Sequence, residues 1–481
     1  MFASSGFSQD KYWLFFSDKG PEAEFYAQHP ERVLSPRALQ KRAKLGIAVR
    51  KSDYPVSTTY LQALKDAGLQ TGKTSRWINA VTVTTDLDFR SLQRICPQVV
   101  DMQPVGTFVH NSVLADFASD ASAYASPATN PDTSGTDTTS TTFSYGASAQ
   151  QIEMLNLDCL HDRGHTGDGV LMAVFDAGFF KVDTLAAFDS MWNANRVMGW
   201  YDFVNQDSGV FDESSHGLGV ISTITANRPG VYVGTAPHVS VVMARTENVF
   251  SEKHQEEDNW LMAVEWADSL GADIIQSSLG YNTFDPGEGD YVYADMNGDS
   301  AIVTRAADMA AARGILVVNS AGNEGNGAWH YITAPCDADS ILCTGAVDIT
   351  GQRAGFSSVG PTADGRIKPD VMAMGSLTSI IGTGGQVSIG SGTSFASPQM
   401  AGLVACLMGA HPDRTNMDVI KAVKMSGDRF MNPDTAYGAG IPDACKADSI
   451  LTVMDSLATQ AEILNNFGAF VKVYPNPAEE A

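Results

Sequence analysis

Basic residues are scarce in this sequence, and long apolar runs are missing. Lys and Arg number 31 against 55 Asp and Glu, which gives a formal net charge of −24. A surface of this sign repels phosphate backbones and anionic lipids, which argues against binding to nucleic acid or to a membrane surface. No stretch approaches about 18 uninterrupted apolar residues, so no membrane span is predicted. The opening MFASSGFSQDKYW lacks a basic segment followed by an apolar one, so we expect any export signal to have been left out.

The cysteines form no CxxC pair, which argues against a zinc ribbon and a thioredoxin-like redox site. They are Cys96, Cys159, Cys336, Cys343, Cys406 and Cys445. Cys336 and Cys343 are close enough in the sequence to form a small disulfide loop, but two free buried thiols fit the pattern equally well. The cysteines therefore do not decide the redox compartment.

The chain is long and apolar enough for several domains, with 481 residues of which 44% are hydrophobic and 18% charged. Residues 1–106 look globular and contain strand-like runs at 12–16 and 80–84. Residues 107–148 are rich in Ala, Ser, Thr, Asp and Gly, and such a segment cannot bury enough apolar area to offset the entropy lost on ordering. We predict that 107–148 is a flexible, cleavable linker.

Residues 149–455 alternate short apolar runs with helical stretches, and 456–481 form a short extension. The apolar runs are VLMAVFDAG, VSVVMAR, ADIIQSSLG, ILVVNSAGN and ILCTGAVD. Nearly continuous apolar strands separated by helices predict an α/β fold with a parallel sheet sandwiched by helices. Functional residues of such sheets lie at the carboxyl ends of strands, where three of these runs carry Asp, Ser-Leu-Gly and Asn.

The motif GTSFASP places Ser394 between a small-residue turn and a run of helix formers. At a helix N-terminus the backbone N–H groups and the macrodipole favour negative charge. A lone Ser there is usually only a helix cap, but this string of flanking residues is longer than a cap requires. GTSFASP resembles the nucleophile motif of the subtilisin-like serine peptidases, the subtilases. The resemblance implies that Ser394 is a nucleophile and that the sheet has the subtilisin-like arrangement.

Subtilases carry their catalytic residues in the order Asp, His, Ser, and this chain offers matching motifs in that order. Asp176 stands in VFDAGF after the first apolar run, and His216 stands in SSHGLGV before a helical stretch. Ser394 needs a base, for which His216 is the candidate, and His216 needs an acceptor that fixes its tautomer, for which Asp176 is the candidate. Either residue by itself would more often be structural, but three matching motifs in order favour the catalytic interpretation.

Two further segments resemble parts of a subtilase site. NSAGNEG resembles the oxyanion segment, so Asn323 is expected to donate its side-chain amide beside the backbone N–H of Ser394, although a turn Asn is the plain alternative. Ser278, Leu279 and Gly280 resemble the segment that pairs with substrate and forms one wall of the S1 pocket. A simple turn at a strand end is the alternative for those three residues.

The resemblance covers about residues 145–450, with two departures from the commonest pattern. Ala177 stands where many subtilases have Ser or Thr, and Gly219 stands where many have a second His. Residues 1–106 resemble, more loosely, the subtilase propeptide, a small α/β domain that assists folding and caps the active site. A plain substrate-binding or structural domain is the alternative. VYPNPA, at 473–478, resembles the start of a type IX secretion sorting domain, so we expect a secreted or cell-surface protein.

There is no Lys or Arg between Arg94 and Arg163. If the chain cuts itself within 107–148, the residue on the acyl side of the cut (P1) is therefore not basic. The large candidates for this position are Leu114, Phe117, Tyr124, Phe143 and Tyr145. Small Ala or Ser sites compete with them. The sequence thus predicts a hydrophobic-to-broad preference in the S1 pocket.

Metal sites are weakly indicated. His161 and His165 have the i, i+4 spacing of a metal pair, but no third ligand is in sight and Gly164 lies between them. The segment DMNGD, at 295–299, resembles the start of a calcium loop but lacks the distant bidentate Glu. A helix cap is the alternative there. We predict no metal ligands and no required cofactor, and structural calcium stays open.

The sequence as a whole predicts a secreted subtilisin-like serine endopeptidase made as a zymogen. Its expected partners are protein or peptide substrates and its own propeptide as inhibitor. A catalytically silent, surface-binding relative is the alternative, but the triad motifs together with Asn323 weigh against it. An esterase or lipase is contradicted by GTSFASP, because such enzymes favour G-x-S-x-G.

Overall fold

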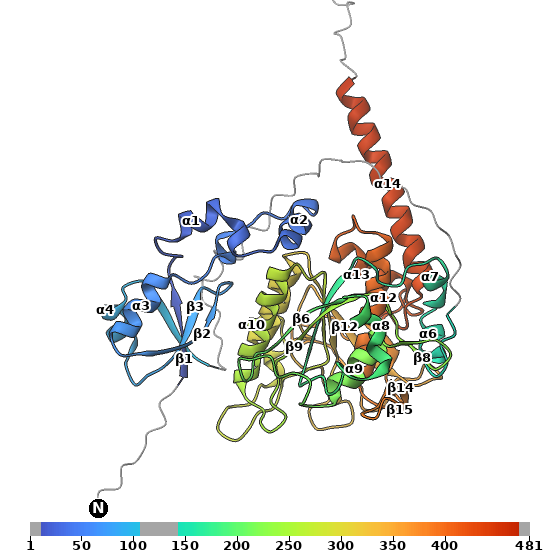
Figure 1. Cartoon of the computed structure of the whole chain (residues 1–481), viewed down its shortest axis with the longest axis horizontal. Helices are drawn as coiled ribbons and strands as arrows, with labels where there is room; N and C mark the ends of the chain where they lie inside the picture. The colour runs from blue at the N-terminus through green and yellow to red at the C-terminus, as the bar shows by residue number, and fades with distance from the viewer. Residues whose placement is uncertain (1–10, 106–142, 471–481) are drawn as a thin grey trace, which may run out of the picture.

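The computed structural model describes residues 11–105 and 143–470, which form two units lying side by side (Figure 1). The N-terminal unit contains a four-stranded antiparallel sheet in the order β2-β3-β1-β4. Its strands are β1 (Lys11–Phe16), β2 (Gln70–Ser75), β3 (Ala80–Thr84) and β4 (Val99–Pro104). Its helices are α1 (Ala23–Gln28), α2 (Pro36–Lys44), α3 (Thr58–Asp66) and α4 (Phe89–Ile95). Both predicted strands of this unit are confirmed.

Strand β1 is buried on both faces, which explains its unbroken apolar sequence. Leu14 and Phe16 enter the core of the N-terminal unit. Trp13 and Phe15 point the other way, into a core shared with helix α10 (His254–Leu270) of the larger unit. Because side chains alternate along a strand, one face of this small sheet completes its own unit and the other docks on the larger one.

The larger unit is built on a seven-stranded sheet in the order β13-β12-β11-β10-β5-β9-β6. Every pairing in it is parallel. Its strands are β5 (Leu171–Asp176), β6 (Val197–Asp202), β9 (Ser240–Arg245), β10 (Ile274–Ser277), β11 (Leu316–Ser320), β12 (Leu342–Val347) and β13 (Val371–Met374). The five apolar runs of the sequence are β5, β9, β10, β11 and β12, so the predicted parallel sheet is confirmed.

Helices cover both faces of this sheet, as the α/β prediction requires. One face packs against α9 (His216–Thr225), α12 (Thr393–Ala410) and α13 (Asn416–Ser426). The other packs against α10 and α11 (Ile302–Ala311). Strand β5 shows why both faces are apolar, because Met172 and Val174 enter the first core whereas Ala173 and Phe175 enter the second.

Shorter elements complete the larger unit. They are α6 (Ala149–Met154), α7 (Asp158–Asp162), α8 (Asp189–Asn193), the two-stranded pairs β7 (Asn227–Arg228) with β8 (Tyr232–Val233) and β14 (Thr378–Ile381) with β15 (Val387–Gly390), and α14 (Ala444–Phe470). Helix α14 extends beyond the body of the unit in Figure 1. The domain boundary expected at residue 455 therefore falls inside a continuous helix.

The predicted linker lies outside the described residues as far as residue 142, and so does the proposed sorting segment at 473–478. The last residues of the linker, 143–148, are described and contact the larger unit. Gly146 forms an isolated β-bridge with Tyr232. Ser148 Oγ donates to the carbonyl oxygen of Val233 at 2.6 Å. This end of the linker is thus part of the larger unit rather than a flexible connection.

Two disulfide bonds lie in the larger unit. Cys336–Cys343, which the sequence left open, is formed. Cys159–Cys445 joins α7 to α14 across 286 residues, and nothing in the spacing pointed to it. Cys96 and Cys406 are free and buried. Among the described residues, no helix combines the length and apolar character needed to cross a membrane.

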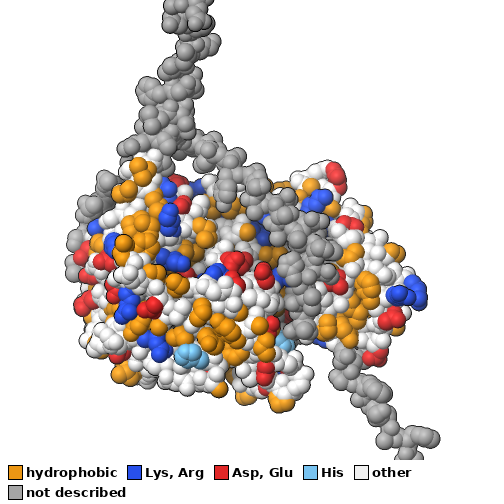
Figure 2. Space-filling model, turned by 180° about the vertical axis from the view of Figure 1, so that it is seen from behind, with side chains coloured by type: hydrophobic (Ala, Val, Ile, Leu, Met, Phe, Trp, Pro, Cys, Tyr) orange, Lys and Arg blue, Asp and Glu red, His pale blue; other side chains and the backbone are white. Residues whose placement is uncertain are grey.

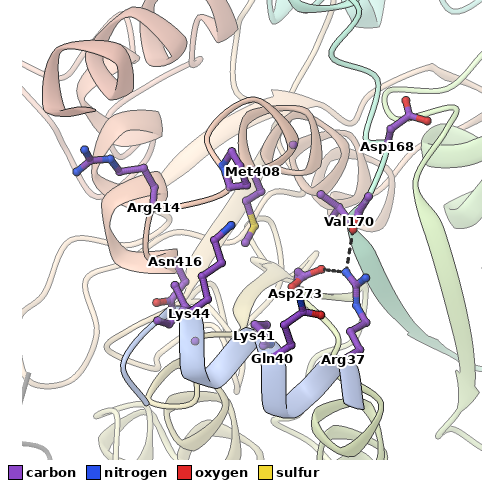
Figure 3. A pocket seen from close by; sticks show the side chains of 15 residues that line it. Arg37, Gln40, Lys41, Lys44, Asp168, Val170, Asp273, Met408, Arg414 and Asn416 are labelled. Carbon is purple, nitrogen blue, oxygen red and sulfur yellow. Dashed lines mark hydrogen bonds and ion pairs between the residues drawn. The ribbon is translucent and has the colours of Figure 1, made fainter. Parts of the chain in front are cut away.

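Helix α2 carries the N-terminal unit to the edge where strands of the larger sheet begin (Figure 3). Arg37 forms an ion pair with Asp273 and donates to the carbonyl oxygen of Gly271. Lys41 donates to the carbonyl oxygen of Ala272. These partners lie just before β10. The N-terminal unit therefore contacts the larger unit at two separate places, through α2 and through the face of its sheet that packs against α10.

A group of buried charges joins the units between these two places. Arg42 pairs with Asp53 of its own unit at 2.5 Å and with Asp268 of α10 at 2.8 Å. Arg313, just after α11, pairs with Asp53 at 3.0 Å. All four side chains are 5% exposed or less. The units must fit closely here, because any of these charges left unpaired would be buried without compensation.

The face of the molecule seen in Figure 2 carries acidic, basic and apolar side chains interspersed, with a group of acidic side chains near its middle. This mixture agrees with the excess of Asp and Glu in the sequence. No continuous basic surface for a phosphate backbone is visible among the described residues of that face.

Candidate active site

Asp176 is the last residue of β5, in the middle of the parallel sheet, and its side chain is fully buried. One carboxylate oxygen accepts a hydrogen bond from the backbone N–H of Ala177 at 2.7 Å. Both oxygens face His216 Nδ1, at 2.9 and 3.0 Å. The backbone N–H of Ala177 thus fixes the carboxylate, whose negative charge faces one imidazole nitrogen, Nδ1 of His216.

His216 is the first residue of α9, and its ring is 35% exposed. The following Gly217 allows α9 to approach the turn after β5, because a Cβ at that position would lie 2.2 Å from the carbonyl oxygen of Gly178. Burial opposes protonation of the ring, but the Asp176 carboxylate outweighs it, so the pKa of His216 lies above its ordinary value. With Nδ1 donating to Asp176, the neutral ring has Nε2 available as a base.

Ser394 lies in the first turn of α12, where backbone N–H groups are not used within the helix. Its Oγ donates to the carbonyl oxygen of Ser278 at 3.4 Å, and Ser278 Oγ donates back to the carbonyl oxygen of Ser394 at 2.8 Å. The neighbouring ring of Phe395 lies 5.9 Å from the ring of His216. The start of α12 therefore stands between the end of β10 and the start of α9.

Asn323 follows β11 and is oriented by the residue before Ser394. Its Oδ1 accepts hydrogen bonds from the backbone N–H and the hydroxyl of Thr393, at 2.9 and 3.0 Å. A backbone N–H can only donate, so the amide oxygen must be the atom on that side. The Nδ2 donors are consequently turned away from Thr393. A hydrogen-bond donor is thereby placed beside the N-terminus of α12.

Ser278, Leu279 and Gly280 directly follow β10. The carbonyl oxygen of Leu279 accepts from Asn319 Nδ2 at 3.0 Å and from Ser320 Oγ at 3.4 Å. The segment is thus attached to the end of the neighbouring strand β11. The structure brings all seven predicted site residues to one place, the carboxyl edge of β5, β10 and β11 together with the starts of α9 and α12.

Comparison with known proteins agrees with this arrangement. The subtilase family (peptidase S8) model matches residues 167–440, and the model of the Bacteroidota peptidase S8 propeptide domain matches residues 11–106. The chain belongs to the subtilase family. It is a serine endopeptidase, and its N-terminal unit is a propeptide domain.

Similarity to curated subtilisins also supports membership of the subtilase family. Subtilisin NAT of Bacillus subtilis subsp. natto is 32% identical over 295 residues, which cover 60% of this chain and 68% of the relative. Subtilisin of Bacillus pumilus is also 32% identical over 295 residues, covering 60% of this chain and 94% of the relative. Among solved structures, a protease from Pseudoalteromonas arctica matches with a TM-score of 0.50 at 23% identity. That match covers 65% of this chain and 100% of the other, and it supports the fold only.

One departure from the commonest subtilase pattern has a structural explanation. At Gly219, where many relatives have His, an added Cβ would lie 3.0 Å from the ring of Phe395 and 3.3 Å from Ile380 Cδ1. The space for a side chain on α9 is therefore filled from the start of α12. The motifs carry no signal for this contact, because Gly219 and Phe395 are far apart in the sequence.

The set-aside metal candidates have other roles. His161 is buried against the carbonyl oxygen of Thr235 and the hydroxyl of Tyr145, and burial lowers its pKa to about 4. Asn297 Oδ1 accepts from the backbone N–H groups of Asp299 and Ser300, which closes a turn. The N-cap of α11 is Ala301 and has no side-chain hydrogen bond, so the helix-cap alternative for 295–299 is not borne out either. In the described ranges, no group of three or more His, Cys, Asp or Glu side chains is arranged to hold a metal ion.

The contact between Asp176 and His216 predicts a measurable shift. Histidine NMR titration of the parent protein should give His216 a pKa above the ordinary value of about 6.5. In Asp176→Asn a neutral amide replaces the carboxylate, so the pKa of His216 should fall while burial still disfavours the charge. Asp183→Asn, which removes an exposed carboxylate, serves as the control and should leave the titration unchanged. Equal His216 titrations in the parent and Asp176→Asn would contradict the assignment.

Proposed function

We propose that Ser394, His216 and Asp176 form the catalytic triad of this serine endopeptidase. The observation that carries the proposal is the fixed pair of Asp176 and His216 beside the N-terminal turn of α12 that holds Ser394. Ser394 Oγ attacks the carbonyl carbon of the scissile bond while His216 Nε2 takes its proton. Because Ser394 Oγ donates to the Ser278 carbonyl in this structure, the proposed transfer requires the side chain to rotate toward His216.

Asn323 and the backbone N–H of Ser394 then donate to the oxygen that becomes negative in the tetrahedral intermediate. The amide of Asn323 is held in advance by Thr393, so no reorganisation is needed as charge develops. Collapse of the intermediate breaks the C–N bond, and His216 returns its proton to the leaving amine. Water repeats the sequence on the acyl-enzyme, releases the acid and restores Ser394.

The segment Ser278–Gly280 is the proposed binding strand for protein or peptide substrates. It continues β10 at the edge where Ser394 lies and is tied to Ser394 by two reciprocal hydrogen bonds. An extended peptide that pairs with this segment carries its carbonyl group to Ser394 and Asn323. Main-chain pairing of this kind gives affinity without depending on side chains.

We also propose that the protein is made as a secreted zymogen whose propeptide domain inhibits it until cleavage within 107–142. The domain is docked through the core around Trp13 and Phe15 and through buried charges at Arg42 and Asp53. Glu265 of α10 adds acceptors for the backbone N–H groups of Arg76 and Trp77, at 3.0 and 3.1 Å. Such an interface persists after a single peptide bond is cut, so the cleaved domain is expected to stay bound to the enzyme.

Self-processing is tested by comparing the intact mass and the new N-terminus of the parent chain with those of Ser394→Ala. We expect the parent to be cut within 107–142 and the variant to remain whole, because alanine has no nucleophile. Ser397→Ala, one turn further along the same helix, is the matched control and should mature like the parent. Identical cutting of parent and Ser394→Ala would show that another protease matures the chain.

The oxyanion role predicts that Asn323→Ala lowers kcat by about 10²–10³-fold and leaves KM little changed, because the lost donor acts mainly in the transition state. Steady-state kinetics with a peptide substrate measure both constants. Asn326→Ala, at an exposed position on the same loop, is the control and should retain parent kinetics. A change in KM alone would contradict the proposed role.

The inhibitory role predicts that Arg42→Ala weakens retention of the cleaved propeptide. The substitution leaves Asp268 buried with fewer partners, and losing one member of a buried charge pair costs about 2–5 kcal/mol of binding. Active peptidase should appear earlier, and less propeptide should co-elute with the matured enzyme in size-exclusion chromatography. Arg90→Ala, at an exposed position on the propeptide, is the control. Equal retention in Arg42→Ala and the parent would rule out this contact as a determinant.

A further inference from the structure

Two segments flank the place where the proposed reaction occurs. One is Ser278–Gly280, after β10, and the other is Ser320–Gly322, which ends β11 and leads directly into Asn323. β10 and β11 are parallel neighbours, so both segments leave the sheet in the same direction. The scissile carbonyl must lie between Ser394 Oγ and Asn323 Nδ2. The side chain of the P1 residue therefore enters between the two segments.

Thr333 stands between these segments and is attached to both. Its backbone N–H donates to the carbonyl oxygen of Ala321 at 3.3 Å. The next residue, Ala334, exchanges two backbone hydrogen bonds with Tyr281, of 2.9 and 3.2 Å. The backbone around Thr333 is thus held on one side by the segment after β10 and on the other by the segment after β11. The backbone at Thr333 cannot move aside without breaking these contacts.

The two glycines that face Thr333 show how closely it fills the gap. A Cβ at Gly280 would lie 2.2 Å from Thr333 Oγ1. A Cβ at Gly322 would lie 3.0 Å from the same oxygen and 3.3 Å from Thr333 Cγ2. Neither segment can carry a side chain toward the other. The space for a P1 side chain is accordingly limited by Thr333 rather than by the two segments on either side of it.

The Thr333 hydroxyl is buried without a hydrogen-bond partner among the described residues. The residue is 2% exposed, and its Oγ1 has no hydrogen-bond partner within the part of the chain that the structure describes. Buried hydroxyl groups are nearly always paired, because leaving one unpaired after removal from water is costly. An unpaired hydroxyl directed between the two segments can be satisfied by a small polar group of a bound substrate.

We infer that Thr333 is a specificity-determining residue that restricts P1 to small side chains and favours Ser over Ala. The inference rests on the proposed function of Ser394 and Asn323, since these atoms define where P1 enters. It narrows the hydrophobic-to-broad preference expected from the sequence. It also selects the small Ala and Ser sites of 107–142 over Leu114, Phe117 and Tyr124 as the place of self-cleavage.

The test uses matured parent enzyme and a series of peptides that differ only at P1, with Ala, Ser, Leu or Phe. For the parent, kcat/KM should be at least about tenfold higher for Ala and Ser than for Phe, since pocket size discriminates by factors of this order. Thr333→Gly should raise kcat/KM for Phe at least about tenfold and leave the value for Ala within about twofold. A parent that cleaves the Phe or Leu peptide as fast as the Ala peptide would overturn the inference.

Thr333→Val separates the two parts of the inference, because it keeps the bulk and removes the hydroxyl. It should still reject Phe but lose the preference for Ser over Ala. Thr344→Val removes another buried, unpaired threonine hydroxyl, from β12, and is the matched control that should keep the parent profile. If Thr333→Gly fails to fold, the parent profile together with Thr333→Val still decides the matter.

Ser394→Ala with the same peptides distinguishes failure of this inference from failure of the proposed function. Complete loss of hydrolysis in Ser394→Ala, combined with a parent that prefers Phe, would overturn only the role of Thr333. Hydrolysis that survives in Ser394→Ala would overturn the catalytic assignment and the inference that rests on it.

Discussion

The whole structure depends on the burial of helix α12 against the parallel sheet. Every side chain from Ala396 to Leu407 is buried, so this stretch of the helix has no solvent face. A helix that is apolar all round is fixed by packing on every side rather than by amphipathic patterning. Its close approach to the chain before β9 requires Gly402, where a Cβ would lie 1.9 Å from Thr235 Oγ1.

The position of the site follows from the position of this helix. Because α12 is surrounded by protein, the N–H groups of its first turn that lack partners within the helix face only one region, the carboxyl edge of the sheet. Asp176, at the end of β5, and Asn323, after β11, reach the same edge because the strands are parallel. The fold thus supplies a helix N-terminus, a buried carboxylate and an amide donor at one place before any substrate arrives.

At the propeptide interface, burial acts on charged side chains. Burial by itself would raise the pKa of Asp53, but the guanidinium groups of Arg313 and Arg42 bring it below its usual range. A buried ion network adds little net stability, yet disrupting one member is costly. Asp268 and Arg313 belong to the enzyme, whereas Arg42 and Asp53 belong to the propeptide. The network therefore favours a single geometry of docking between the propeptide and the enzyme. Separating the two units requires the charged side chains of both to become solvated again.

Much of the fold could be predicted because strands buried on both faces appear as continuous apolar runs, as in β5, β10 and β11. The candidate site could be predicted because each residue lies in a short motif at an element boundary. Contacts between distant segments carry no such local signal. Cys159–Cys445 and the docking of Arg42 on Asp268 became visible only in three dimensions. Thr333 has no motif, and its importance follows only from its place between two glycines.

The contact between Gly219 and Phe395 is a further example of such a distant contact, since it joins α9 to the start of α12 beside the proposed base. The Phe395 ring occupies the space that a side chain at 219 would need, and its centroid lies 5.9 Å from that of the imidazole, while Asp176 faces Nδ1 of the same imidazole. The histidine is thus positioned by a charge from β5 and by a ring from α12. Since Phe395 also follows Ser394 directly, the packing that orients the proposed base fixes the start of the helix that carries the proposed nucleophile.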